Sequence, residues 1–246
     1  MLYFVGAGPG AKDLITVRGM KLLQNADVVI YAGSLVNPEL LEYCKSDCSV
    51  YDSSQLTFNE IINIISDSER EEKMLVRLHT GDPSLFGAVK EQMDELDRLN
   101  IPYESCPGVS SFCGAASSLN LEYTLPGISQ KVIITRTPGR TPMPKGSTIV
   151  YFLSSSNAAK VTEELRTEGF SDYTPTAVVY KATWPDEKVL YCRLKDLEET
   201  LLKAGISKTA LIIVGDVIGA RVYDRSRLYA PDFETGYRKT SRTTED

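Results

Sequence analysis

Three glycine-containing segments have the residue types that let a ligand lie against bare backbone. Residues 6–10 (Gly-Ala-Gly-Pro-Gly) follow an apolar run that predicts a strand, and they precede a segment with helical periodicity. Residues 80–83 (Thr-Gly-Asp-Pro) and 107–110 (Pro-Gly-Val-Ser) follow two further predicted strands. Glycine allows a close approach of the backbone, and N–H groups at a helix start can bind a polar ligand. A structural turn explains one such loop equally well, but three at the carboxyl edge of one sheet favour a binding cleft.

The first of these loops does not have the pattern of a dinucleotide site. Its spacing is G-x-G-x-G with a proline inside it, not G-x-G-x-x-G. The next predicted strand ends in Tyr31-Ala32-Gly33, with no acid to hold a ribose hydroxyl. A nicotinamide-dependent oxidoreductase is therefore disfavoured and stays the second enzyme class. A non-catalytic nucleotide-sensing module is also compatible with the sequence.

Two titratable residues accompany the second loop. Asp82 can cap the helix that follows it or lie near the positive charge of a ligand, and the two roles are compatible. His79 is the only histidine of the chain, and a lone histidine beside a strand is more often structural than catalytic. No carboxylate cluster has ligand spacing and the five cysteines are scattered, so we expect neither a metal site nor a disulfide framework. Reduced thiols are typical of a cytoplasmic protein, which we expect here.

A stretch without acidic residues offers a binding surface for carboxylates. No Asp or Glu occurs between Tyr123 and Thr162, although the net charge of the chain is -6. Arg136 and Arg140 flank a Thr-Pro-Gly turn in this stretch, and a guanidinium can bind a carboxylate through two hydrogen bonds. A solvated basic loop is an equal alternative. The acidic net charge and the lack of a long apolar run argue against partners such as nucleic acid or a membrane.

The elements that must position these loops alternate between strands and helices in the first half of the chain. Apolar runs and helical periodicity there predict strands at residues 2–5, 28–31, 49–51, 74–78 and 103–106 and helices at 14–24, 58–66, 86–99 and 110–119. This alternation implies a mostly parallel sheet with helices on both faces. The second half predicts strands at 131–135, 148–153, 176–180, 188–192 and 210–214 and helices at 158–168 and 197–203. Its adjacent strands with a short connection indicate a mixed sheet.

The pattern breaks at residues 123–127 (Tyr-Thr-Leu-Pro-Gly), where we expect a domain boundary. The expected fold is α/β, with two α/β domains at residues 1–122 and 123–234. The polar residues 235–246 are expected to form a disordered tail.

Taken in order, the loops resemble the tetrapyrrole C-methyltransferase family. Residues 5–10, 80–87 and 107–110 match its successive signatures. Residues 31–36, 135–142, 180–187 and 225–229 are similar to the branch that methylates precorrin-4 or cobalt-precorrin-4 at C11 in cobalamin synthesis. Alternatives within the family methylate uroporphyrinogen III or another precorrin carbon, or modify a translation factor or ribosomal RNA.

The resemblance implies S-adenosylmethionine as the cofactor, bound in a cleft between the two domains and leaving as S-adenosylhomocysteine. Its cofactor contacts fall, position by position, on Pro9, Thr80, Gly81, Asp82, Leu85, Ser110, Ser111, Leu153 and Ala182. A tetrapyrrole is the implied substrate and a homodimer the implied assembly. We hypothesise that Arg136, Arg140 and Lys181 bind the carboxylates of the substrate.

The resemblance assigns no catalytic base. The family often has an acid directly after the first glycine loop, whereas Ala11-Lys12-Asp13 delays it here, so this carboxylate is given no role. Transfer of a methyl group from a sulfonium to an electron-rich carbon depends mainly on alignment and on the exclusion of water. A strong protein base is therefore not required.

Overall fold

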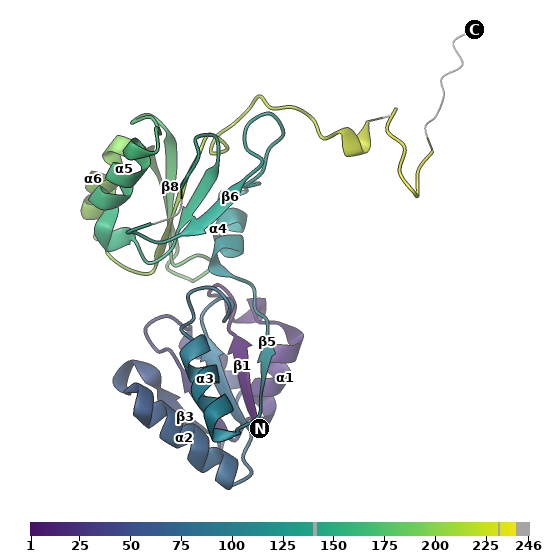
Figure 1. The fold of residues 1–246 in the computed structure, drawn as a ribbon, viewed down its shortest axis with the longest axis vertical. Coiled ribbons are helices and arrows are strands. Elements are labelled where there is room, and N and C mark those ends of the chain that lie inside the picture. The colour runs from purple at the N-terminus through teal and green to yellow at the C-terminus, as the bar shows by residue number, and fades with distance from the viewer. Residues whose placement is uncertain (140–141, 231, 240–246) are drawn as a thin grey trace.

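The computed structural model describes residues 1–139, 142–230 and 232–239, which form two α/β bodies stacked end to end (Figure 1). The first body contains a parallel sheet with the strand order β3-β2-β4-β1-β5. Its strands are β1 (Leu2–Gly6), β2 (Val28–Tyr31), β3 (Ser49–Asp52), β4 (Leu75–His79) and β5 (Tyr103–Cys106). Because the strands are parallel, their carboxyl ends share one edge, and this edge faces the second body.

Helices cover both faces of the first sheet, as expected from the strand–helix alternation. They are α1 (Val17–Asn25) on one face and α2 (Phe58–Arg70) with α3 (Lys90–Leu99) on the other. Leu23 of α1 and Ile65 of α2 are buried against opposite faces of the strands. α2 begins with a capping box, in which Thr57 and Glu60 each accept a hydrogen bond from the other's backbone N–H.

The second body contains the expected mixed sheet, with the strand order β6-β7-β10-β8-β9. Its strands are β6 (Val132–Thr135), β7 (Thr148–Tyr151), β8 (Pro175–Tyr180), β9 (Lys188–Arg193) and β10 (Ala210–Val214). β6 and β7 are parallel, and the other neighbouring strands are antiparallel. One face is covered by α5 (Ala158–Thr167) and α6 (Leu197–Ala204), and the other by α4 (Ser111–Leu119).

α4 crosses from the first sheet to the second. It follows β5 in the chain, yet it lies beside the second sheet (Figure 1). The buried Ala115 packs with apolar residues of that sheet. Gly114 lets α4 also lie close to the first glycine loop, since a Cβ on Gly114 would lie 2.6 Å from Cβ of Pro9. The division at residue 123 stays a prediction about folding units, while by packing the second body begins with α4.

The predicted strands are all present within two residues of their expected bounds, but two helices begin later than predicted. The helix expected from residue 86 begins at Lys90, because Phe86 and Ala88 have φ values of +55° and +49°. The helix expected from residue 14 begins at Val17, because the Thr16 side chain accepts the Gly19 N–H and caps it.

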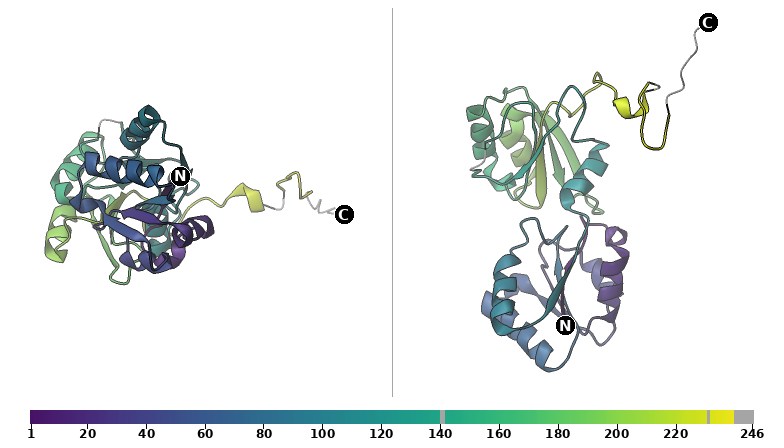
Figure 2. Two further views of the ribbon diagram at one scale, coloured as in Figure 1. Left: turned by 90° about the horizontal axis from the view of Figure 1, so that it is seen from below. Right: turned by 45° about the vertical axis from the view of Figure 1, so that its right-hand side comes forward.

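Short 3₁₀ segments complete the described structure. They are Lys12–Leu14, Pro38–Tyr43, Ser53–Gln55, Ser155–Asn157, Leu194–Asp196 and Arg227–Tyr229. After Asp224, whose N–H donates to the Pro126 carbonyl at 3.1 Å, the chain leaves the second body as an extended arm (Figure 2). The expected tail at 235–246 lies mostly outside the described residues. Among those described, no helix has the length and apolar character to span a bilayer.

Candidate active site

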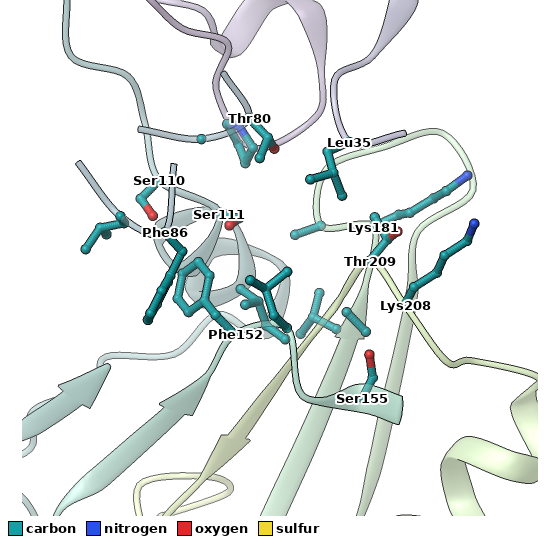
Figure 3. Close-up of a pocket in the computed structure, with 18 of the residues that line it drawn as sticks. Leu35, Thr80, Phe86, Ser110, Ser111, Phe152, Ser155, Lys181, Lys208 and Thr209 are labelled. Carbon is teal, nitrogen blue, oxygen red and sulfur yellow. The ribbon is translucent and has the colours of Figure 1, made fainter. Parts of the chain in front are cut away.

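A cavity of about 300 Å³ lies between the two bodies, at the carboxyl edge of the first sheet (Figure 3). The nine residues assigned to the cofactor by resemblance all line it, namely Pro9, Thr80, Gly81, Asp82, Leu85, Ser110, Ser111, Leu153 and Ala182. Seven of them come from the loops after β1, β4 and β5, and two come from the second body. The structure therefore brings together residues that are up to 173 positions apart in the chain.

The three glycine loops touch one another through bare backbone. Gly8 and Gly81 exchange two backbone hydrogen bonds, of 3.3 and 2.9 Å. A Cβ added to Gly108 would lie 2.2 Å from the Gly81 carbonyl oxygen and 2.7 Å from Cα of Gly6. Any larger residue would separate the loops, so the glycines are required for the shape of this edge.

Asp82 ties the second glycine loop to the third. Its carboxylate accepts hydrogen bonds from the Gly108 N–H at 2.8 Å and from the Ser84 N–H at 2.9 Å. Burial acts to raise the pKa of Asp82, but the hydrogen bonds from Ser84 and Gly108 outweigh it and hold the pKa below its usual value. Asp82 is thus an ionised residue that fixes the loops and still borders the cavity.

Replacing Asp82 by alanine is expected to lower the free energy of unfolding by about 1–3 kcal/mol, since two backbone N–H groups lose their charged acceptor. Urea denaturation at pH 7 measures this change. Asp216→Ala is the matched control, because Asp216 is an exposed aspartate in a loop after β10 and outside the cavity lining. Equal losses in the two variants would contradict the loop-fixing role.

A turn of the second body supports the first glycine loop. The Trp184 ring lies so close to Gly10 that a Cβ there would be 2.1 Å from Cδ1 of the indole. The Ala11 N–H donates to Thr183 Oγ1 at 3.0 Å. Glu187 fixes the turn from behind, because its carboxylate accepts the Ser118 hydroxyl at 2.6 Å. The first loop therefore depends on both bodies.

Lys181 lines the cavity but is already paired. Its ammonium lies 2.6 Å from the Asp186 carboxylate and 5.0 Å from the centre of the Trp184 ring. The hydrogen bond with Asp186 raises the pKa of Lys181. Lys181 can therefore bind a substrate carboxylate only in competition with Asp186.

Residues 136–139, the described part of the loop that carries Arg136, lie beside the cavity and not in its lining. Arg136 is exposed directly after β6, next to the segment of Phe152 and Leu153 that follows β7. Glu164 holds this loop, since its carboxylate accepts the Gly139 N–H at 2.9 Å and the Thr137 hydroxyl at 2.5 Å. Arg140 lies outside the described residues.

The sequence reasoning missed several residues of the cavity. Phe86 of the first body and Phe152 of the second pack with their ring centres 5.2 Å apart and close one end. Leu35 and Lys208 also line the cavity. The resemblance at residues 31–36 was the only signal for Leu35, and Lys208 carried no signal at all.

Backbone strain is concentrated around the cavity. Phe86, Leu153, Lys181 and Thr209 line it and have φ values of +55°, +51°, +49° and +56°. These values lie in the left-handed region, which non-glycine residues rarely adopt and which is common at ligand sites. No pattern of residue types predicts such strain, because the packing of both bodies imposes it.

The lining supports binding and orientation without a metal or an obvious base. Among the described residues no group of histidines, cysteines and carboxylates could hold a metal ion. His79 is 5% exposed and lies against Phe4, outside the cavity lining, with Nε2 unpartnered. Burial and the nearby Arg77 lower its pKa to about 3. A neutral, enclosed imidazole outside the lining is poorly placed to act on a ligand in the cavity.

Comparison with known proteins gives a consistent answer. Residues 1–198 match the family model described as tetrapyrrole (corrin/porphyrin) methylases. A cobalt-precorrin-4 C(11)-methyltransferase from Methanocaldococcus jannaschii is 50% identical, with 97% of this chain and 96% of that protein covered. A solved cobalt-precorrin-4 methyltransferase is 45% identical, with a TM-score of 0.82 over 88% of this chain and 95% of the other. A uroporphyrin-III C-methyltransferase from Thermus thermophilus, solved with S-adenosylhomocysteine, is 28% identical, with a TM-score of 0.74 over 92% and 96% of the two chains. The cavity between two α/β bodies, the glycine loops and these matches together establish that the chain belongs to the tetrapyrrole methylase family.

Proposed function

We propose that this protein transfers a methyl group from S-adenosylmethionine to C11 of precorrin-4 or cobalt-precorrin-4 in cobalamin synthesis. The observation that carries the proposal is the 50% identity, over 97% of the chain, to a protein with that name. Family membership also displaces the nicotinamide-dependent oxidoreductase that the glycine loop left open.

The cavity fits the cofactor in size and chemistry. A volume of about 300 Å³ is in the range of small-ligand sites. The glycine loops supply backbone donors and acceptors, and Leu35, Leu153 and Leu211 supply apolar surface for a purine or ribose. We propose the nine residues named above as its contacts. When bound, the cofactor supplies an electrophilic methyl group.

The substrate needs more room than the cavity offers, because a tetrapyrrole is several times larger than a nucleoside. We infer that the macrocycle lies over the open side of the cavity, with its reacting carbon directed inward. Arg136, directly after β6, and Arg140, four positions later in the sequence, are our candidates for its carboxylates. Lys181 joins them if it is released from Asp186. The loops then act by aligning the two reactants and excluding water.

We also propose a cytoplasmic homodimer. The described cysteines are all free, which fits a reducing compartment. The arm after Asp224 exposes Leu228, Tyr229 and Tyr237, and Tyr223 just before it is also exposed. Aromatic side chains gathered on a projecting arm are typical of a contact with another subunit.

The test is incubation of the purified protein with methyl-labelled S-adenosylmethionine and cobalt-precorrin-4, followed by mass spectrometry and carbon NMR. We expect one labelled methyl group at C11. A label on another carbon would keep the family and change the step. No transfer, with authentic substrate and bound cofactor, would contradict the proposal. The metal-free substrate, run in parallel, measures the preference for cobalt.

A further inference from the structure

We propose that Lys208 is the carboxylate-binding residue of this cavity. The carboxylate would come from the methionine part of the cofactor or from a side chain of the macrocycle. The inference rests on the proposed function, since both ligands are taken from it.

The charges around the cavity single out Lys208. Of the described residues that line it, only Asp82, Lys181 and Lys208 carry a charge. Asp82 accepts hydrogen bonds from the two loops that it joins, and Lys181 is paired with Asp186 at 2.6 Å. Lys208 forms no ion pair or hydrogen bond with any other described side chain. The cavity therefore has one lysine whose charge is not neutralised by any side chain of residues 1–139, 142–230 and 232–239.

The backbone around Lys208 is fixed in an unusual conformation. Its neighbour Thr209 has a φ of +56°, which a β-branched residue strongly disfavours. The Thr209 carbonyl accepts the Lys181 N–H at 2.9 Å, and Lys181 itself has a φ of +49°. This hydrogen bond joins the loop that follows β8 to the loop that precedes β10, and both of its residues have left-handed backbone conformations. This arrangement directs both lysine side chains to the same side of the cavity (Figure 3).

The cavity has an aromatic end and a cationic end. Phe86 and Phe152 lie at one end, and the Lys181 and Lys208 side chains extend at the opposite one (Figure 3). A ligand that carries an apolar ring and a carboxylate at opposite ends matches this polarity. Lys208 is exposed at the cationic end, so its ammonium can reach a carboxylate on a ligand that extends out of the cavity.

The first arm of the test measures binding of the cofactor product by calorimetry. The probes are S-adenosylhomocysteine and its analogue that lacks only the carboxylate. If the cofactor supplies the carboxylate, Lys208→Met lowers the affinity for S-adenosylhomocysteine by about 10- to 100-fold. The affinity for the analogue does not change. Lys208→Arg retains most of the affinity because it keeps the charge. Raising the salt concentration lowers the affinity of the wild type for S-adenosylhomocysteine and does not change that of Lys208→Met.

The second arm measures steady-state kinetics with cobalt-precorrin-4. If the macrocycle supplies the carboxylate, Lys208→Met leaves S-adenosylhomocysteine binding unchanged and raises the KM for the macrocycle by about 10- to 100-fold, with little effect on kcat. Lys21→Met is the matched control, because Lys21 is an exposed lysine on α1 and outside the cavity lining. Thermal unfolding of each variant checks that the fold is intact.

The inference is overturned if Lys208→Met changes neither the affinity for S-adenosylhomocysteine nor the KM for cobalt-precorrin-4. It is also overturned if the affinities for S-adenosylhomocysteine and for the analogue fall equally. Failure of the proposed function is recognised separately, in the wild type. If the wild type binds S-adenosylhomocysteine but does not methylate the macrocycle, the proposed reaction is contradicted, while the binding test of the first arm still applies. A wild type that binds neither ligand loses both proposals.

Discussion

Gly108→Ala is expected to lower the free energy of unfolding by about 3 kcal/mol or more and to abolish cofactor binding. The added methyl group would lie 2.2 Å from the Gly81 carbonyl oxygen and 2.7 Å from Cα of Gly6. Both contacts are with backbone, so no side chain can rotate away. The clash can be relieved only by separating the loops that form the floor of the cavity.

Urea denaturation and calorimetry with S-adenosylhomocysteine measure the two effects of Gly108→Ala. Gly236→Ala is the control for adding a methyl group, because a Cβ at Gly236 meets nothing within 4 Å. A Gly108→Ala protein with wild-type stability and affinity would show that the loops can move apart without cost. The role that we assign to their contact would then be wrong.

His79 is expected to make the protein less stable in mild acid. Its pKa is lowered to about 3 in the folded state, from a usual value of 6.5. The neutral form is therefore favoured by folding, and the stability that it contributes is complete above pH 6.5. This stability is lost as the pH falls toward 3, at about 1.4 kcal/mol per pH unit between about pH 6 and 4.

The chain offers a clean measurement of this effect, because His79 is its only histidine. The free energy of unfolding is measured by urea denaturation at pH 7.5, 6.5 and 5.5 for the wild type and for His79→Gln. Carboxylates titrate in both proteins, so the difference between the two curves isolates His79. We expect the free energy of unfolding of the wild type to fall, relative to that of His79→Gln, as the pH is lowered. Parallel curves would contradict a buried, neutral imidazole.

Local sequence patterns were sufficient for the strands and the sheet types. The inner strands are short apolar runs that their neighbours bury, and a run of this kind can be recognised in the sequence. The edge strands β3, β5, β6 and β9 are mostly exposed or half-buried, and they were recognised from their position in the strand–helix alternation and from β-branched or aromatic residues. The start of α3 could not be predicted, because the left-handed residues Phe86 and Ala88 interrupt a segment with good helical periodicity. The packing of α4 on the second sheet could not be predicted either, since Ala115 contacts strands that come much later in the chain.

The candidate site was predictable only in part, and for a related reason. The nine cofactor positions came from the resemblance, and they meet because their loops follow parallel strands or face them. The pairing of Lys181 with Asp186 weakens the role in substrate binding that we hypothesised for Lys181. The place of Lys208 in the cavity lining and the contact between Phe86 and Phe152 both depend on segments that are far apart in the chain. A single sequence holds no local signal for such contacts.

The support of the first glycine loop by the Trp184 turn has a consequence for synthesis on the ribosome. Ala11 bonds to Thr183, 172 positions later, and Gly10 packs on the Trp184 ring. At the usual rate of elongation, roughly 10 to 35 s pass between the synthesis of the loop and that of these partners. The strands of the first sheet are all synthesised earlier. A nascent chain that stalls before residue 187 would therefore carry a folded first body with an unsupported loop. Such a fragment would be unable to retain the cofactor and would present open backbone to chaperones or proteases.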